Sequence, residues 1–205
     1  WTGDNTSNFA HLAMSIPMLL NMGLTGQPFT GADVGGFCNN CEPELYARWI
    51  SFASIAYPFC RSHTTQSTID QEPYSFGDRV EEISRTYIQL RYRLMPYFYT
   101  WARHSCITGQ PILRSLFYMY PTVSKCYEAE FASTQLFVGP DLLVCPVVTS
   151  NATTRTLYLP PGTWYSFYDR KEYSGDKVIT VDAPWETVPL FVRENSQIPM
   201  RKIHR

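Results

Sequence analysis

The residues best suited to chemistry stand at the start of the chain, in Trp1-Thr2-Gly3-Asp4-Asn5. A pyranose has a rim of hydroxyl groups and an apolar C–H face, so sugar sites pair carboxylates with aromatic walls. A carboxylic acid held beside an indole resists ionisation, and Asp4 could therefore be a proton donor. Alternatively, Asp4 or Asn5 caps the helix that follows. These five residues alone leave both interpretations open.

Further polar residues follow two short apolar segments. Asp33 lies in the glycine-rich run Gly-Ala-Asp-Val-Gly-Gly that ends at Phe37, and Arg61 and His63 follow Pro-Phe-Cys. The Asp33 carboxylate could accept sugar hydroxyls, orient a neighbouring charge or only cap its own turn. A lone His or Arg is most often structural, and a Phe after two glycines is most often part of a core.

Taken with the neighbouring segments, these residues have the order and spacing of a known family. The segments are SIPMLLNMGLTG, PFTGADVGGF, EPELYARW, PFCRSH, QEPYSFGD and LRYRLMPYFYT. Over nearly all 205 residues the chain resembles the C-terminal half of glycoside hydrolase family 31, the α-glucosidase and α-xylosidase family. The resemblance implies a chain that enters a (β/α)8 barrel after its sixth strand and continues into a β-sandwich. Strands one to six would lie outside it.

The resemblance also assigns roles to the polar and aromatic residues. Asp4 matches the family's general acid/base, and Trp1 would form a wall of the same sugar subsite. His63 would donate a hydrogen bond to the sugar at subsite −1, whereas Arg61 would order nearby carboxylates. The candidate substrate-binding residues are Trp1, Asp33, Phe37, Arg61 and His63.

A retaining glycosidase needs two carboxyl groups roughly 5 Å apart, one as nucleophile and one as acid and then base. The family's nucleophile lies in an Asp-Met-Asn-Glu-like motif on an earlier strand, which has no counterpart in this sequence. We therefore expect an inactive fragment of a retaining exo-acting α-glucosidase that removes terminal α-linked glucose from oligosaccharides. An α-xylosidase, an α-transglucosylase, a glucan lyase and a non-catalytic truncated sugar-binding chain remain alternatives.

The composition agrees with a protein that handles carbohydrate. Hydrophobic residues make up 44% of the chain and aromatic residues 15%, enough for a sizeable core and for stacking on sugars. A net charge of −1 gives no electrostatic reason to expect nucleic acid or an anionic membrane as partner. The expected partner is an oligosaccharide or glycoside, with no cofactor, while compartment and oligomeric state are not indicated. No membrane-length apolar run or signal peptide is evident, and a chain that starts without Met inside a motif indicates a fragment.

The cysteines and two short motifs have simpler interpretations. The six cysteines do not have framework-like spacing and are expected to be free thiols. Cys38 and Cys41 have metal-ligand spacing but lack a second pair, so no metal site is expected. Asn5-Thr-Ser and Asn151-Ala-Thr match the acceptor pattern for N-glycosylation, although a glycan at Asn5 would crowd the proposed acid. The remaining histidines are expected at surface or packing positions: His11, His104 and His204.

Two kinds of pattern divide the chain into predicted domains of residues 1–110 and 111–205. Apolar periodicity predicts helices over 8–22, 44–54 and 78–106, the last kinked near Pro96, with short strands at 28–30 and 57–60. Helices alternating with strands are typical of a parallel barrel, which carries its chemistry after the strands. From 111 onward the pattern predicts a β-sandwich. Its expected strands are 112–119, 137–138, 142–148, 155–159, 164–168, 177–181 and 188–192.

Overall fold

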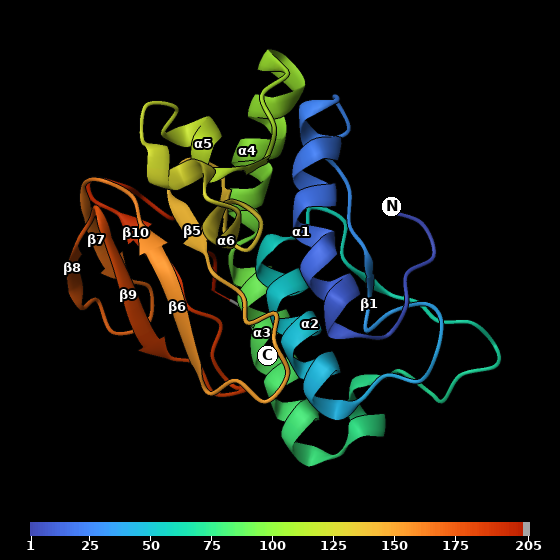
Figure 1. The fold of residues 1–205 in the computed structure, drawn as a ribbon. Helices are drawn as coiled ribbons and strands as arrows, with labels where there is room; N and C mark the ends of the chain where they lie inside the picture. Colours follow the sequence, from blue (N-terminus) through green and yellow to red (C-terminus); the bar gives the residue numbers. More distant parts are fainter. Residues whose placement is uncertain (203–205) are drawn as a thin grey trace.

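The computed structural model describes residues 1–202, and His204 lies outside the described residues. Figure 1 shows helices gathered on one side of the molecule and antiparallel strands on the other. We call residues 1–110 the helical region and residues 111–202 the sheet region. No helix among the described residues has the length and apolar character needed to cross a bilayer.

The helical region alternates helices with two very short strands. Its elements are α1 (Phe9–Leu24), β1 (Asp33–Val34), α2 (Pro43–Ala56), β2 (Arg61–Ser62), the 3₁₀ helix η1 (Pro73–Phe76), α3 (Asp78–Arg93) and α4 (Met95–Thr108). Strands β1 and β2 pair in parallel, with Asp33 opposite Arg61. Parallel strands joined by a helix form the repeating unit of a (β/α)8 barrel, as the sequence predicts.

Helix α1 shows how the first motif is joined to the fold. Its N-cap is Asn8, whose Oδ1 accepts a hydrogen bond from the His11 backbone N–H at 2.8 Å. The alternative that Asp4 or Asn5 caps this helix is therefore wrong, and Asp4 remains free for another role. Leu12, Ile16 and other apolar residues at helical spacing are buried, so α1 packs one face into the core.

The two predicted strands are displaced along the chain. They were expected at 28–30 and 57–60, but the paired residues are Asp33–Val34 and Arg61–Ser62. Pro28 and Pro58 have no N–H to donate to a ladder, and Phe29 is 53% exposed instead of buried. Each strand therefore begins at a candidate site residue, Asp33 in β1 and Arg61 in β2.

The long predicted helix is interrupted near Pro96, as the sequence indicates. Helix α3 ends at Arg93, Leu94 caps it, and α4 starts at Met95. Pro96 lies in the first turn of α4, where its missing N–H costs no helical hydrogen bond. Figure 1 shows α4 above α3 and beside α5.

The sheet region contains two antiparallel sheets. Its strands are β3 (Leu113–Arg114), β4 (Leu136–Val138), β5 (Leu142–Val144), β6 (Thr154–Leu159), β7 (Thr163–Ser166), β8 (Glu172–Ser174), β9 (Lys177–Asp182) and β10 (Leu190–Arg193). One sheet has the order β3-β4-β5-β10-β7-β8, and the other pairs β6 with β9. Short helices precede β4: α5 (Leu116–Met119), the 3₁₀ helix η2 (Ser124–Tyr127) and α6 (Ala129–Ala132).

Several details of the sheet region differ from the prediction, and the strand expected at 142–148 ends at Val144. The strand expected at 112–119 ends at Arg114, because the Ser115 side chain accepts the Tyr118 N–H at 3.2 Å and starts α5. Strand β8 was not predicted. It pairs at the sheet edge and its residues are not buried, so it lacks the apolar alternation that identifies a strand.

The six-stranded sheet lies between the helices and the β6–β9 sheet. Along β4, Leu136 and Val138 belong to the apolar core shared with the helices, whereas Phe137 belongs to a second core shared with β6. The same alternation occurs along β5 and β10. Because successive side chains of a strand point to opposite faces, both faces of this sheet are covered. The sandwich expected from the sequence is confirmed, with the helices as a third layer.

A buried charged pair on α2 joins the two regions. Arg48 donates hydrogen bonds to the carbonyl oxygens of Ala183 (2.9 Å), Pro184 (2.7 Å) and Ala152 (2.7 Å). Glu44 lies 3.6 Å from Arg48 and accepts the backbone N–H of Asn151 at 3.0 Å. Burial lowers the pKa of Arg48, which the nearby Glu44 carboxylate opposes. We call Glu44 and Arg48 the α2 clamp.

Candidate active site

Asn5 links the first motif to the glycine-rich loop. Its Nδ2 donates to the Asp33 carbonyl oxygen at 3.0 Å, and its Oδ1 accepts the Phe37 N–H at 2.9 Å. Its backbone oxygen also accepts the N–H groups of Phe37 and Cys38, both at 2.9 Å. Asn5 is buried, so these bonds are shielded from water. They fix the backbone next to Asp4 against the loop that carries Asp33 and Phe37.

The glycine-rich loop and the segment that follows the first motif approach each other closely at Ser7, because Gly36 has no side chain. A Cβ atom there would lie 2.5 Å from the Ser7 backbone nitrogen, and the φ angle of +92° favours glycine. Ser7 N–H in turn donates to the Cys38 carbonyl oxygen at 2.9 Å. The glycine run therefore serves a close contact between backbones.

Asp33 and Arg61 form an ion pair across β1 and β2. Arg61 Nε lies 2.7 Å from Asp33 Oδ1, and the Asp33 side chain is fully buried. Its other oxygen, Oδ2, has no hydrogen-bond partner among the described residues. Of the possible roles for Asp33, the geometry favours orienting a neighbouring charge over contact with sugar hydroxyls, because a solute cannot reach a buried carboxylate.

Arg61 also contacts two aromatic side chains, Trp1 and Phe59. Its guanidinium carbon lies 5.1 Å from the centre of the Trp1 ring and 5.7 Å from that of the Phe59 ring, within the range of cation–π attraction. Trp1 is 55% exposed, and Thr2 N–H donates to the Gly31 carbonyl oxygen at 3.1 Å. The Trp1 indole is therefore partly exposed to solvent and is also in contact with the Arg61 guanidinium.

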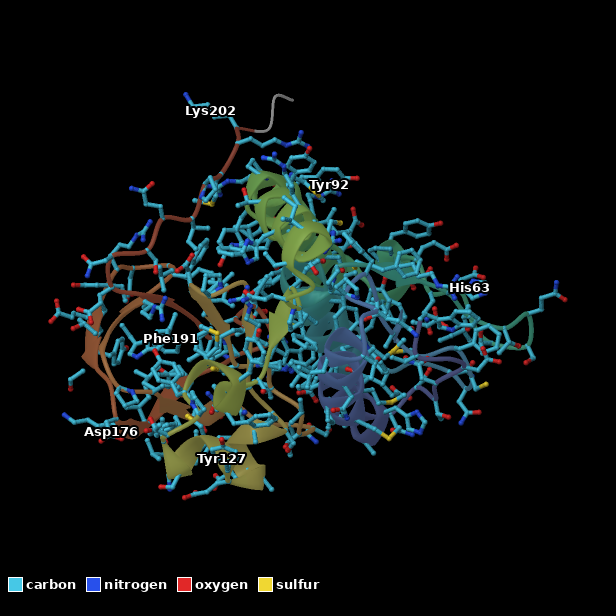
Figure 2. All side chains as sticks on the ribbon, turned by 90° about the horizontal axis from the view of Figure 1, so that it is seen from above. His63, Tyr92, Tyr127, Asp176, Phe191 and Lys202 are labelled. Carbon is cyan, nitrogen blue, oxygen red and sulfur yellow. The ribbon has the colours of Figure 1, made fainter. Side chains whose placement is uncertain are left out.

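Phe37 and His63 form a second contact between the loops. Their ring centres are 5.3 Å apart at an angle of 31°. The Phe37 carbonyl oxygen accepts the Thr65 N–H at 3.0 Å, which holds the segment after His63 against the glycine-rich loop. His63 is exposed, and Figure 2 shows it on the opposite side of the molecule from Phe191 of β10.

The structure thus joins five of the six candidate residues in two groups of contacts and fixes the backbone next to the sixth, Asp4. Trp1, Arg61 and Asp33 form one chain of contacts, and Phe37 and His63 form another. Asp4 follows Gly3, is exposed to solvent and precedes the buried Asn5. A carboxyl group in this position is free to meet a solute, while its backbone is fixed.

Two residues of this region were missed or misjudged from the sequence. Asn5 was considered only as a cap or a glycosylation acceptor, and Gln71 was not considered. Gln71 is buried, and its Nε2 donates to the carbonyl oxygens of Val34 and Gly36, both at 3.1 Å. Both side chains bond to backbone groups at least 28 positions away, so no local pattern reveals them.

Cysteine chemistry and metal binding find little support at this site. All six cysteines lie among the described residues and are free thiols, as the sequence predicts. Burial raises the pKa of Cys41 to about 12, so this thiol beside the glycine-rich loop stays protonated at neutral pH and is a poor nucleophile. Within residues 1–202, no three His, Cys, Asp or Glu side chains cluster as metal ligands would.

Comparison with known proteins defines the class to which this fold and site belong. Residues 1–101 match the glycosyl hydrolases family 31 TIM-barrel domain, and residues 109–198 match the glycosyl hydrolase family 31 C-terminal domain. The chain belongs to glycoside hydrolase family 31, a family of glycosidases, which confirms the resemblance and the fold class inferred from the sequence.

Individual relatives agree with this assignment. The chain is 44% identical over 203 residues to the probable glucan 1,3-alpha-glucosidase of Arabidopsis thaliana, covering 98% of this chain and 22% of that protein. It is 37% identical over 205 residues to alpha-glucosidase 2 of Bacillus thermoamyloliquefaciens, covering 100% and 26%. The chain thus spans about a quarter of the length of these relatives.

Solved structures of the family have the same fold. A Flavobacterium johnsoniae GH31 dextranase complexed with glucose superposes with a TM-score of 0.92 and 38% identity, over 100% of this chain and 26% of that one. A GH31 alpha-xylosidase from a soil metagenome, complexed with xylose, superposes with a TM-score of 0.89 and 28% identity, over 97% and 32%.

Proposed function

We propose that residues 1–205 supply the acid/base half of a retaining α-glucosidase site, and that a longer protein containing them removes terminal α-linked glucose from oligosaccharides. The observation that supports this most is the set of buried hydrogen bonds from Asn5 to the glycine-rich loop. They fix the backbone next to an exposed carboxyl group, Asp4, against the loop that carries Asp33 and Phe37.

Asp4 acts in both halves of the proposed reaction. In the first, its carboxyl group donates a proton to the glycosidic oxygen as the C1–O bond breaks and a carboxylate nucleophile bonds to C1. In the second, the Asp4 carboxylate removes a proton from water as the water oxygen bonds to C1 and the nucleophile leaves. The nucleophile belongs to a strand outside residues 1–205. The 205-residue chain by itself should therefore bind sugar weakly and turn none over.

The other site residues hold the sugar or each other. Trp1 offers an aromatic wall for the C–H face, and Arg61, oriented by the buried Asp33, holds that wall from behind. His63 donates a hydrogen bond to a sugar hydroxyl and is steadied by its contact with Phe37. Asp33 and Arg61 are positioning residues in this account, whereas Trp1, Phe37 and His63 line the sugar subsite.

Glucose is favoured over xylose by the relatives. The two α-glucosidases are 44% and 37% identical to the chain, whereas the α-xylosidase structure is 28% identical. The difference between the two sugars is the C6 hydroxymethyl group. Residues that admit or exclude it would decide between these functions, and a competition between p-nitrophenyl α-glucoside and α-xyloside measures their effect directly.

The acid role is tested in a polypeptide that joins this chain to the missing barrel strands. Asp4→Ala should slow hydrolysis of a disaccharide on the order of 10²–10⁴-fold, because its leaving group needs protonation. An activated aryl glucoside needs no proton, so its bond cleavage should be slowed far less. The matched variant His63→Ala should weaken both substrates by similar factors. Equal losses for both substrates in Asp4→Ala would show that Asp4 is structural.

A further inference from the structure

The chain has two acceptor sequences for N-glycosylation, and the proposed function uses neither as such. They are Asn5-Thr6-Ser7 and Asn151-Ala152-Thr153. Both match the pattern Asn-X-Ser/Thr, with Ser7 at the third position of one and Thr153 at that of the other, and the structural surroundings of the two asparagines differ sharply.

At the first of these sequences the asparagine is fully engaged. Asn5 is 8% exposed, and both polar atoms of its side chain are hydrogen-bonded, Nδ2 to Asp33 O and Oδ1 to Phe37 N–H. A sugar on Nδ2 would have to occupy the contact between the first motif and the glycine-rich loop. A folded chain cannot carry a glycan there.

At the second acceptor sequence the asparagine side chain is exposed to solvent. Asn151 lies between β5 and β6, is exposed, and has a φ angle of +58°, a turn conformation that Asn tolerates. Its Nδ2 donates only to Ser150 Oγ at 3.0 Å, and an amide nitrogen that carries a sugar still has one N–H for that bond. Thr153 is also exposed, so the acceptor motif faces solvent at both ends.

The backbone around Asn151 is held from the inner side by the α2 clamp. Glu44 accepts the Asn151 N–H at 3.0 Å, and Arg48 donates to the Ala152 carbonyl oxygen at 2.7 Å. On the side of the acceptor sequence, these two bonds use the backbone groups of Asn151 and Ala152. The side chain of Asn151 meets the clamp through Ser150, whose Oγ accepts from Asn151 Nδ2 at 3.0 Å and donates to Glu44 Oε2 at 3.4 Å. A glycosylated Nδ2 keeps one N–H for the bond to Ser150, so a glycan on that side chain leaves the junction of the two regions unchanged.

We infer that Asn151 is an N-glycosylation site of this protein when it passes through a secretory compartment, and that Asn5 is not. The donor would be an oligosaccharide linked to a lipid diphosphate. Asn151 Nδ2 bonds to the sugar C1 as the bond from C1 to the diphosphate oxygen breaks. The lipid diphosphate leaves, and the amide proton passes to a base of the transferase. This inference does not depend on glycosidase activity.

The test expresses the chain behind a cleavable signal peptide in a eukaryotic secretory host and examines the soluble, monomeric fraction. Treatment with peptide N-glycosidase, which converts a glycosylated Asn to Asp, should give a single mobility shift and a mass increase of about 1 Da at residue 151. The shift should vanish in Asn151→Gln and in Thr153→Ala. It should persist in Ser7→Ala, which removes only the first acceptor sequence.

Thermal unfolding of the same protein, with and without its glycan, shows whether the glycan disturbs the fold. Enzymatic removal of the glycan should leave the thermal midpoint of the wild-type chain nearly unchanged. Absence of a shift in soluble wild-type protein would overturn the inference. So would soluble, folded protein with a glycan on Asn5, because it would show that burial at this position does not exclude a sugar.

Discussion

The helical and sheet regions differ in how completely their strands and apolar side chains are covered. In the sheet region, β4, β5 and β10 bury both faces, and β7 and β8 extend the same sheet. In the helical region, two strands of two residues each pair only with one another, and aromatic side chains beside them are exposed, among them Trp1, Phe29 and Phe59. Unpaired strand edges and exposed apolar side chains mark surfaces that another part of a protein normally covers. The candidate site lies in the region that is less complete.

The α2 clamp connects these unequal regions. Its Arg48 donates hydrogen bonds to backbone carbonyl oxygens of the sheet region. It lies on α2, the helix that precedes β2 and Arg61 in the chain. The difference between the regions is that the six-stranded sheet is covered on both faces, whereas the helical region carries exposed aromatic residues next to the side chains proposed to act in catalysis.

Separating the regions should affect them unequally. Residues 1–110 expressed alone should aggregate, because the separation exposes the apolar surface that α1 packs against β3 and α2 packs against β5. Residues 111–205 should remain more soluble and melt cooperatively. Size-exclusion chromatography and calorimetry on both pieces measure this. A monomeric, cooperatively melting 1–110 piece would remove the contrast on which this account is built.

Breaking the clamp should be the most damaging single substitution at the junction. Arg48→Met leaves the buried Glu44 uncompensated and three carbonyl oxygens without their donor, a loss of about 3–5 kcal/mol in unfolding free energy. Arg79→Met is the matched control, since the Arg79–Glu186 pair is exposed and should contribute at most about 1 kcal/mol. Urea denaturation measures the loss of unfolding free energy in both variants. Equal losses would refute a special role for the α2 clamp.

Asn5 should matter more than the helix cap beside it. Asn5→Ala removes two buried side-chain hydrogen bonds and leaves a backbone acceptor and donor with fewer partners, for a loss of about 2–3 kcal/mol. Asn8→Ala removes only the N-cap of α1, worth about 1 kcal/mol. Denaturation midpoints should rank the variants in that order. The reverse order would mean that the motif is tied down by α1 and not by the glycine-rich loop.

Alkaline pH should have a smaller, graded effect on both regions. Burial raises the pKa of Cys41 in the helical region and of Cys145 in the sheet region to about 12. An unfolded thiol ionises at pH values of about 8.5, so between there and pH 12 the unfolded state binds fewer protons than the folded state. Stability should therefore fall as pH rises through this window. Cys145→Val should make the decline shallower, and a urea midpoint independent of pH from 7 to 10 would contradict the burial of these thiols.

The extent to which sequence predicts this structure depends on how local the relevant forces are. Helix α1 and the break at Pro96 follow from side-chain periodicity and from the missing proline N–H, both local properties. Strands β1 and β2 were misplaced because three of their four paired residues are polar, while Phe29 and Phe59 in the apolar segments before them are exposed. Family resemblance compensated for this by identifying the motifs themselves.

The candidate site shows the same limit. Asp4, Asp33, Arg61 and His63 were found because their motifs match the family, but the sequence left three roles open for Asp33. Only the structure reports its burial and its 2.7 Å contact with Arg61. Gln71 was missed because its two acceptors, Val34 and Gly36, are brought to it by the fold. Side chains that bond to distant backbone groups leave no trace in spacing.

The central claim, that Asp4 is the acid/base of a retaining site, is tested most directly by the product formed when azide replaces water. Each of the two displacements inverts C1, so azide that attacks the glycosyl-enzyme of an Asp4→Ala variant gives an α-glucosyl azide from an α-glucoside. This account predicts that azide accelerates turnover of an activated aryl α-glucoside by the variant joined to its barrel strands, with the α-azide as product. A β-glucosyl azide would instead identify Asp4 as the nucleophile, and no azide product at all would mean that Asp4 has no catalytic role.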